Sequence, residues 1–393
     1  MKKVLFCESG YNRFYGAQQS LYNFLVNVDK ESIEAVVLCP NKGKFTEEIN
    51  RVNIPVEIVS YPKVLDKTGE EAKSTNLITK VKMLIGGLRY LKKYMKYFKR
   101  NKVDLVYCND IRSILTCGLA ARLSGIPVLW YVRINKKLGV YNHIGANIAS
   151  KIVVIADNVK TIFNDKYIFN AKEKFSTIYT GINLKEVDSV EETGSLIKEL
   201  NLSPEIKLVG IIASIQPRKG QKDLVKSIVS LKKERCKSIE NTKFLIIGDT
   251  QDVKQKEYLK EVKEIIKENN LQENVLFLGW RQDVLQILKQ IHLLVLPSYS
   301  EGLPRTVLES LACNCPVIAT NVAGTGEIIN HKKNGMLVSP GDIEGLAKSL
   351  KYMLEDNRRL NKMGNEGRKT IEKKFEMEKY ISELKEIVIK TAK

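Results

Sequence analysis

Residues 297–310 read PSYSEGLPRTVLES and join a largely apolar run to a helical pattern. The run Ile291–Leu296 predicts a buried parallel strand, and Thr306–Ala312 predicts a helix. Gly302 and Pro304 mark the turn between them. A buried strand that passes directly into a helix is typical of a parallel α/β sheet, so this segment sets the fold class.

Two carboxylates, Glu301 and Glu309, stand eight residues apart across this junction. Because eight residues are a little over two helical turns, a helix that begins near Pro304 would turn both acids toward one cleft. The free N–H groups at the helix start would meet the same space and suit an anion. This arrangement could bind a sugar nucleotide through its ribose, its hexose and its diphosphate. The alternative is an ordinary strand–turn–helix with exposed acids.

The segment resembles the Glu-x7-Glu signature of the family 4 retaining glycosyltransferases of GT-B fold. Further segments resemble the same family in order and spacing: 218–220, 244–249, 319–329 and 334–342. The resemblance implies two Rossmann-like, doubly wound parallel-sheet domains that face across a cleft, with a C-terminal helix that crosses back to the first domain. It also implies transfer of a sugar from a nucleoside-diphosphate sugar without a metal.

Short apolar runs alternate with helical patterns along the whole chain, which independently predicts parallel sheets. The expected strands are 2–8, 35–39, 56–59, 105–108, 128–132, 151–156, 207–213, 244–247, 275–278, 293–296, 317–319 and 335–338. Helices are expected over 17–28, 114–123 and 158–164, and a last one over 377–390. We expect an acceptor-binding domain over 1–185, joined by 375–393, and a nucleotide-sugar domain over 204–374. The polar stretch 185–203 is interpreted as a linker.

The resemblance assigns most donor contacts to the second domain. It implies that Glu301 binds the transferred sugar and is catalytic, whereas Glu309 binds the ribose. The full set of expected donor-binding residues is Gly16, Gly248, Gly302, Leu303, Pro304, Arg305, Thr306, Val307 and Glu309. Gly16 belongs to this set because a glycine at a helix start lets backbone approach a phosphate closely.

Breaking a sugar–phosphate bond puts negative charge on the leaving diphosphate, which cations and backbone N–H groups can stabilise. Lys219 and Arg218 follow a predicted strand at its carboxyl edge, where such sheets bind ligands. Family members usually carry an arginine near the position of Ser214, so the cation that supplements Lys219 is open, and Arg218 is the candidate. The alternative is two exposed loop cations.

In the first domain, Tyr15 replaces the first glycine of a loop that resembles the family's Gly-Gly loop. Tyr15, Asn109 and Asp110 are expected to bind the acceptor. Arg133 follows a strand where many relatives place a histidine near the reacting sugar, and it is expected to clamp an anionic donor or acceptor. For each of these residues a purely structural role in a loop is an equal alternative.

No metal site or cofactor is predicted beyond the nucleotide sugar itself. An Asp-x-Asp motif is absent from the sequence, and its three histidines, His143, His292 and His331, are widely spread. His292 falls in a predicted buried strand, where a structural role is expected. Seven scattered cysteines are typical of a reducing cytosol rather than of a disulfide framework.

The net charge of +19 calls for an anionic partner. Between Lys80 and Lys102 there are nine basic residues and no acidic one. An apolar stripe is expected on one helical face, from Val81, Leu84, Ile85, Leu88, Leu91, Met95 and Phe98, and a basic face opposite, from Lys82, Arg89, Lys93, Lys96 and Arg100. We expect this helix to contact anionic membrane, whereas no motif indicates nucleic acid. An ordinary solvated basic face is the alternative.

These observations predict a retaining hexosyl or N-acetylhexosaminyl transferase. Its donor is expected to be a UDP-sugar, with a GDP-sugar as the alternative, and its acceptor a cell-surface polysaccharide or lipid-linked glycan. It is expected to be cytoplasmic and peripheral on the inner face of the cell membrane. Two other functions stay open: a sugar-nucleotide epimerase of similar fold, and a non-catalytic basic protein that binds lipid or nucleic acid.

Overall fold

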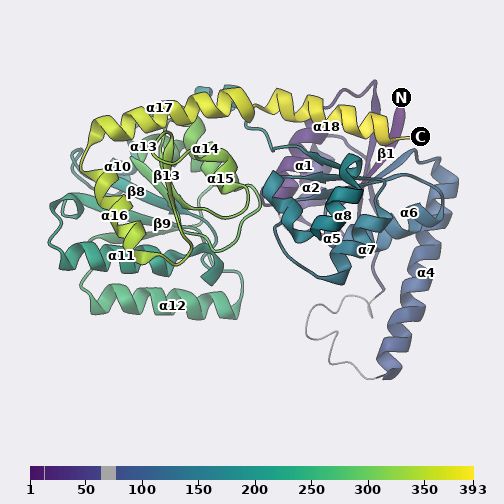
Figure 1. Ribbon diagram of the computed structural model, residues 1–393, viewed down its shortest axis with the longest axis horizontal. Helices are drawn as coiled ribbons and strands as arrows, with labels where there is room; N and C mark the ends of the chain where they lie inside the picture. Colours follow the sequence, from purple (N-terminus) through teal and green to yellow (C-terminus); the bar gives the residue numbers. More distant parts are fainter. Residues whose placement is uncertain (13, 63–76) are drawn as a thin grey trace. The chain divides into compact units, whose positions relative to one another are not determined.

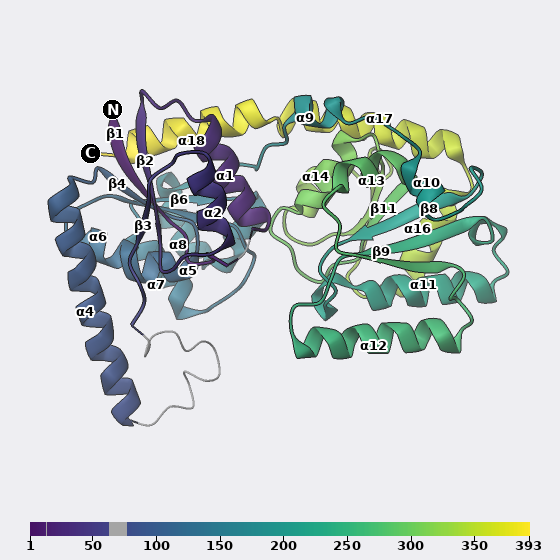
Figure 2. The same cartoon turned by 180° about the vertical axis from the view of Figure 1, so that it is seen from behind.

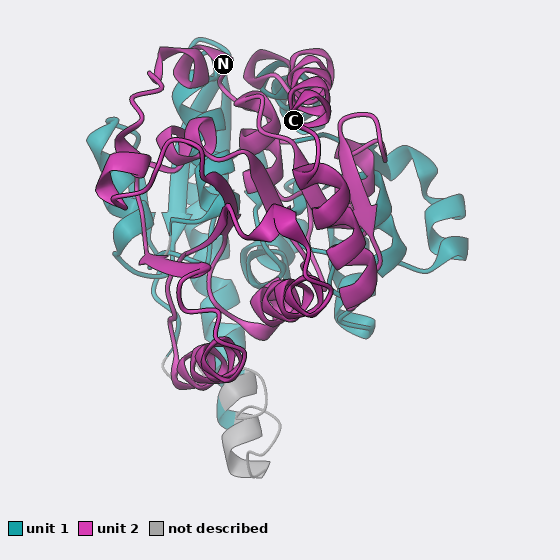
Figure 3. Ribbon diagram, turned by 90° about the vertical axis from the view of Figure 1, so that its left-hand side faces the viewer, with its two compact units in different colours: residues 1–179, 380–393 teal, residues 180–379 magenta. Residues whose placement is uncertain are grey.

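The computed structural model describes residues 1–12, 14–62 and 77–393, which divide into two compact units (Figure 3). Unit 1 comprises residues 1–179 and 380–393, and unit 2 comprises residues 180–379. Each unit contains one wholly parallel sheet with helices packed on it (Figures 1 and 2). The predicted class, two Rossmann-like α/β domains with a C-terminal helix that returns to the first, is confirmed.

The sheet of unit 1 has seven strands in the order β3-β2-β1-β4-β5-β6-β7. They are β1 (Lys2–Cys7), β2 (Ile33–Cys39), β3 (Val56–Ile58), β4 (Leu105–Cys108), β5 (Val128–Val132), β6 (Lys151–Val154) and β7 (Phe175–Thr177). The helices are α1 (Gly16–Asn27), α2 (Lys44–Arg51), α4 (Leu77–Asn101), α5 (Ile111–Ser113), α6 (Leu119–Leu123), α7 (Val140–Ile148), α8 (Asp165–Asn170) and most of α18 (Met377–Thr391). The sequence pattern missed β7, because its residues Phe175–Thr177 include one apolar side chain, too few to form an apolar pattern.

The sheet of unit 2 has six strands in the order β10-β9-β8-β11-β12-β13. They are β8 (Lys207–Ile212), β9 (Thr242–Ile247), β10 (Val275–Gly279), β11 (Leu293–Leu296), β12 (Val317–Thr320) and β13 (Gly335–Val338). The helices are α9 (Leu184–Ser189), α10 (Ser195–Glu199), α11 (Gln221–Lys233), α12 (Val253–Glu268), α13 (Val284–Gln290), α14 (Arg305–Ala312), α15 (Thr325–Ile328), α16 (Ile343–Leu354) and α17 (Asn357–Lys374).

Both sheets reverse their strand order at one place. In unit 1 the strands on either side of β1 are β2 and β4, and in unit 2 the strands on either side of β8 are β9 and β11. At such a switch point the connections leave in opposite directions, so a crevice opens at the carboxyl ends of the two central strands. The fold therefore predicts one ligand crevice between β1 and β4 and another between β8 and β11.

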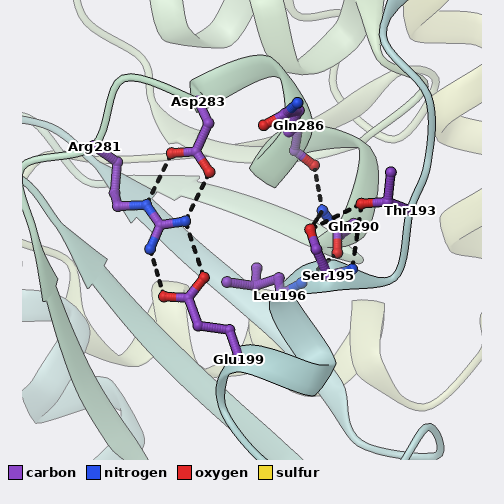
Figure 4. A network of polar contacts seen from close by, with 8 residues as sticks. All are labelled: Thr193, Ser195, Leu196, Glu199, Arg281, Asp283, Gln286 and Gln290. Carbon is purple, nitrogen blue, oxygen red and sulfur yellow. Dashed lines mark hydrogen bonds and ion pairs between the residues drawn. The ribbon is translucent and has the colours of Figure 1, made fainter.

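The stretch expected to be a linker, 185–203, is instead folded onto unit 2. It contains α9 and α10, and Leu196 is buried. Arg281 donates to both oxygens of Glu199 at 2.5 and 3.0 Å and also to Asp283 (Figure 4). Polar composition misled the prediction, because these polar side chains bond to unit 2 and not only to water.

Helix α4 also differs from its predicted pattern. Among its described side chains, Tyr90, Tyr94 and Phe98 are buried, whereas Ile85 and Leu88 of the expected stripe are 45% and 53% exposed. Tyrosine can pack inward here because the Tyr90 hydroxyl donates to the Val59 carbonyl at 2.9 Å and lies 2.7 Å from the Tyr94 hydroxyl. Of the other expected members, the side chains of Val81 and Leu84 lie outside the described residues.

Two other helical predictions were only partly right. Residues 111–123 are helical but include a π-helical stretch at Ile114–Gly118, and the helix expected over 158–164 is a 3₁₀ helix at Asp157–Ile162. Helix α18 agrees with its prediction. Tyr380, Leu384 and Val388 recur at four-residue spacing and are buried in unit 1.

Candidate functional site

Unit 2 carries an ion pair across its switch point. Lys219 follows β8 and Glu301 follows β11, and the Lys219 Nζ lies 2.7 Å from the Glu301 Oε1. The two side chains are 15% and 8% exposed, so solvent screens this pair little. Arg218 is more exposed, at 45%, and its Nη1 lies 3.7 Å from the Glu301 Oε2. The sequence predicted all three residues, and the structure brings them together.

Glycines hold the two loops of this pair close together. Gly220 has a φ of +72°, and a Cβ atom there would lie 2.1 Å from the Pro297 carbonyl oxygen. The Tyr299 N–H donates to the Arg218 carbonyl at 2.8 Å, which ties the same loops a second time. Gly248 has a φ of +144°, and its Cβ would lie 2.0 Å from the Ala213 carbonyl oxygen. Any larger residue would push these loops apart.

The other residues predicted for the donor lie at the start of α14. Arg305 Nε donates to Glu309 Oε1 at 2.6 Å, so Glu309 has a different partner from Glu301. The Thr306 hydroxyl donates to the Ile212 carbonyl at 3.4 Å. Three of the predicted side chains, those of Leu303, Pro304 and Val307, are buried. The Gly302 carbonyl accepts from the Gly324 N–H at 2.8 Å.

Unit 1 contains a pocket of about 480 Å³ at its own switch point. The loops that follow β1, β4 and β5 line it, together with residues of α1 and α7. Apolar and aromatic walls, among them Trp130, Tyr131 and Ile134, surround a small polar group. A largely apolar concavity with few convergent polar groups is typical of a small-molecule site.

A chain of hydrogen bonds forms that polar group. Asn109 Nδ2 donates to Glu8 Oε2 at 2.5 Å, and the Arg133 Nε donates to Asn109 Oδ1 at 2.6 Å. Arg133 also donates to the Tyr107 and Tyr380 hydroxyls at 3.2 and 3.4 Å. Its Nη1 is buried without a hydrogen-bond partner among the residues that the structure describes. Arg133 is thus fixed in the wall of the pocket.

Glu8 is 2% exposed, and its Oε1 accepts from the Gly10 N–H at 2.6 Å. Burial, followed by the negative charge of Asp110, raises the pKa of this carboxyl to about 7. Asp110 has a structural role as well. Its carboxylate accepts from the N–H groups of Arg112, Ser113 and Ser9 at 2.8 to 2.9 Å, which caps α5 and ties it to the loop after β1.

Three of the residues predicted for unit 1, Asn109, Asp110 and Arg133, line this pocket, whereas Tyr15 and Gly16 do not. Tyr15 is exposed and Gly16 begins α1. Glu8 was missed, because the sequence pattern places it inside the strand expected over 2–8, whereas β1 ends at Cys7 and Glu8 directly follows it. A polar residue directly after a buried strand is the signal that could have found it.

Among the described residues, no group of three or more His, Cys, Asp or Glu side chains could hold a metal ion. His292 is exposed and precedes β11, so its predicted place inside a buried strand was wrong. Its Nδ1 accepts from the Leu208 N–H at 3.1 Å, and that of His331 accepts from the Leu337 N–H at 3.0 Å. Both rings therefore bond to the backbone.

Two family descriptions match this chain over most of its length. Residues 14–186 match Glycosyltransferase Family 4, and residues 193–370 match Glycosyl transferases group 1. A relative from Escherichia coli, UDP-Gal:alpha-D-GlcNAc-diphosphoundecaprenol alpha-1,3-galactosyltransferase, is 25% identical over 78% of this chain and 80% of its own. The Staphylococcus aureus capsular polysaccharide biosynthesis glycosyltransferase CapM is 23% identical over 84% of this chain and 88% of its own.

The fold has solved counterparts. The crystal structure of Anabaena HepE in complex with UDP superposes with a TM-score of 0.79 at 20% identity, over 98% of this chain and 99% of that one. The complex of the same protein with UDP-glucose gives a TM-score of 0.77. These likenesses concern the arrangement of strands and helices.

Proposed function

Because this chain belongs to the family 4, group 1 glycosyltransferases, we propose that it transfers a hexose or N-acetylhexosamine from a UDP-sugar to a glycan. The proposed acceptor is lipid-linked or a cell-surface polysaccharide, as in the names of the two sequence relatives. We further propose that transfer retains the anomeric configuration, needs no metal, and proceeds with the leaving phosphate helping to deprotonate the acceptor.

The ion pair across the switch point of unit 2 carries this proposal. An ammonium group has three N–H donors, so Lys219 can bond to Glu301 and still offer two donors to a diphosphate. These donors are fixed before the sugar–phosphate bond breaks, which is the condition for stabilising charge that develops in a transition state. Glu301 in turn has oxygens that can accept from sugar hydroxyls.

A thermal-shift comparison of UDP, GDP and dinucleotides tests the donor. A ligand that binds only the native state raises the melting temperature, so UDP should raise it more than GDP does. Incubation with UDP-sugars alone separates the epimerase alternative, because an epimerase would convert the donor without any acceptor. No shift with any nucleotide would contradict the proposal.

We expect the two acids of unit 2 to differ in their effects. Glu309→Gln should weaken UDP binding, since Glu309 is proposed to bind the ribose. Glu301→Gln should mainly lower turnover, since it loses the charge that orients Lys219 and the transferred sugar. Dissociation constants for UDP and steady-state turnover check this, with the exposed Glu344→Gln as the control. Unchanged affinity and rate in both variants would contradict the assignment.

We also propose that α4 attaches the protein to the inner face of the cell membrane. Exposed basic side chains recur along it: Lys82, Arg89, Lys93, Lys96 and Arg100. The exposed Ile85 and Leu88 lie on the same helix and could enter the lipid headgroup region. None of the described helices is long and apolar enough to cross a membrane. Attachment would therefore be by surface contact.

Replacing those five basic residues with Gln should abolish binding to anionic vesicles and leave UDP affinity unchanged. Each basic residue near an anionic surface contributes about 1 kcal/mol, so the combined loss is large. Vesicle sedimentation of the wild type should weaken as salt rises. A matched variant with Ile85 and Leu88 changed to Ser should weaken binding without changing its salt dependence. Sedimentation that ignores salt would contradict electrostatic docking.

A further inference from the structure

The floor of the unit 1 pocket contains an acid to which neither the resemblance nor the comparisons assign a role. Glu8 directly follows β1 and Asn109 directly follows β4, the two strands on either side of the switch point. The hydrogen bond between them is 2.5 Å long, and both residues line the pocket. Glu8 belongs to no ion pair among the described residues.

Such a carboxyl is costly to bury, and its neighbours do not fully compensate it. A buried carboxylate without a cation partner loses hydration that neutral hydrogen bonds from the Gly10 N–H, Asn109 and Gln18 restore only in part. Each carboxylate oxygen has two lone pairs, so these three bonds leave acceptor capacity. The unpartnered Nη1 of Arg133 shows that the same polar chain lacks a further partner at its other end.

We infer that Glu8 positions the acceptor by accepting hydrogen bonds from hydroxyl groups of a sugar in the unit 1 pocket. A sugar fits this chemistry because its hydroxyls donate to a carboxylate while its C–H faces pack on apolar walls, here Trp130 and Ile134. The inference rests on the proposed function, since it names the part of the acceptor that this pocket holds.

Glu8 then makes acceptor binding depend on pH. Only its ionised form is a pure hydrogen-bond acceptor, so binding should be strongest above pH 7 and weaken as the carboxyl takes up a proton. Four titratable or charged groups lie near Glu8. Asp110 follows β4, Tyr107 lies in β4 and Cys39 lies in β2. Arg133, which follows β5, is linked to Glu8 through Asn109.

Binding of methyl glycosides of N-acetylglucosamine, galactose and glucose tests this directly, with the full chain and saturating UDP. For the glycoside that binds, the association constant of the wild type should fall about tenfold from pH 8 to pH 6, as one proton competes with the ligand. Glu8→Gln should bind weakly and without pH dependence. Glu8→Asp should keep the pH dependence, and the exposed Glu31→Gln should behave as the wild type.

The outcomes separate this inference from the proposed function. If UDP binds but no glycoside does, or if wild type and Glu8→Gln share one pH profile, the role of Glu8 is refuted. The proposed binding of a UDP-sugar by unit 2 is then unaffected. If glycosides bind through Glu8 but UDP does not, the proposed transfer fails instead. Melting curves of each variant without ligand, unchanged from the wild type, show that a loss of glycoside binding is not a loss of the fold of unit 1.

Discussion

Replacing Lys219 with Ala is expected to lower kcat/KM by about 30- to 1,000-fold, which corresponds to about 2–4 kcal/mol of barrier. The substitution removes the hydrogen-bond donor that we propose for the leaving diphosphate, and it leaves the buried Glu301 carboxylate without its 2.7 Å partner. The second effect leaves a carboxylate whose remaining cation, Arg218, lies 3.7 Å away, near the place where negative charge is proposed to develop. Steady-state kinetics with UDP-sugar and acceptor measure the loss.

Arg218→Ala is the matched control for that variant. Arg218 is more exposed and lies farther from Glu301, so its loss should lower the rate much less. Turnover of the wild type should be the same in EDTA, since the proposal gives the cationic role to Lys219 and not to a metal. A normal rate in Lys219→Ala, or turnover that EDTA abolishes, would overturn this assignment.

Gly220→Ala is expected to destabilise unit 2 by about 3 kcal/mol or more, because it adds a collision to backbone strain. The new Cβ would lie 2.1 Å from the Pro297 carbonyl oxygen, in a backbone conformation at φ +72°. For a unit of this size the apparent melting temperature should fall by about 6–12 °C, as calorimetry can show.

Gly194→Ala separates the two causes. Gly194 has a similar φ, +60°, but a Cβ there would meet nothing within 4 Å. It should therefore show only the strain of about 1–2 kcal/mol. Equal losses in both variants would mean that the close approach of the loops at Lys219 and Glu301 contributes nothing to stability.

The strands could be predicted because a buried parallel strand is a local pattern. Three of them, β4, β5 and β13, begin and end at the predicted residues. The Lys219–Glu301 ion pair could also be anticipated, since both residues follow strands at the carboxyl edge of one sheet. In each case a short segment contains the physical cause, which is why one sequence was enough.

What the sequence could not predict depends on partners that are distant along the chain. Tyr90 can be buried only because its hydroxyl donates to the Val59 carbonyl. The stretch 185–203 resembles a linker in composition, but its Glu199 accepts hydrogen bonds from Arg281. Glu8 looks like the last residue of a strand, and only its bond to Asn109, 101 residues later, shows its place in the pocket. Burial of a polar group depends on such long-range bonds, and composition does not reveal them.

Unit 1 is completed by residues that are synthesised after all of unit 2. Tyr380 donates to the Ser20 carbonyl at 3.1 Å and receives a hydrogen bond from Arg133, so it belongs to both the core and the pocket wall. On the ribosome, the seven strands of unit 1 therefore emerge early, but α18 can pack on them only after residues 180–379 have been made. The nascent protein thus completes unit 2 before it completes unit 1.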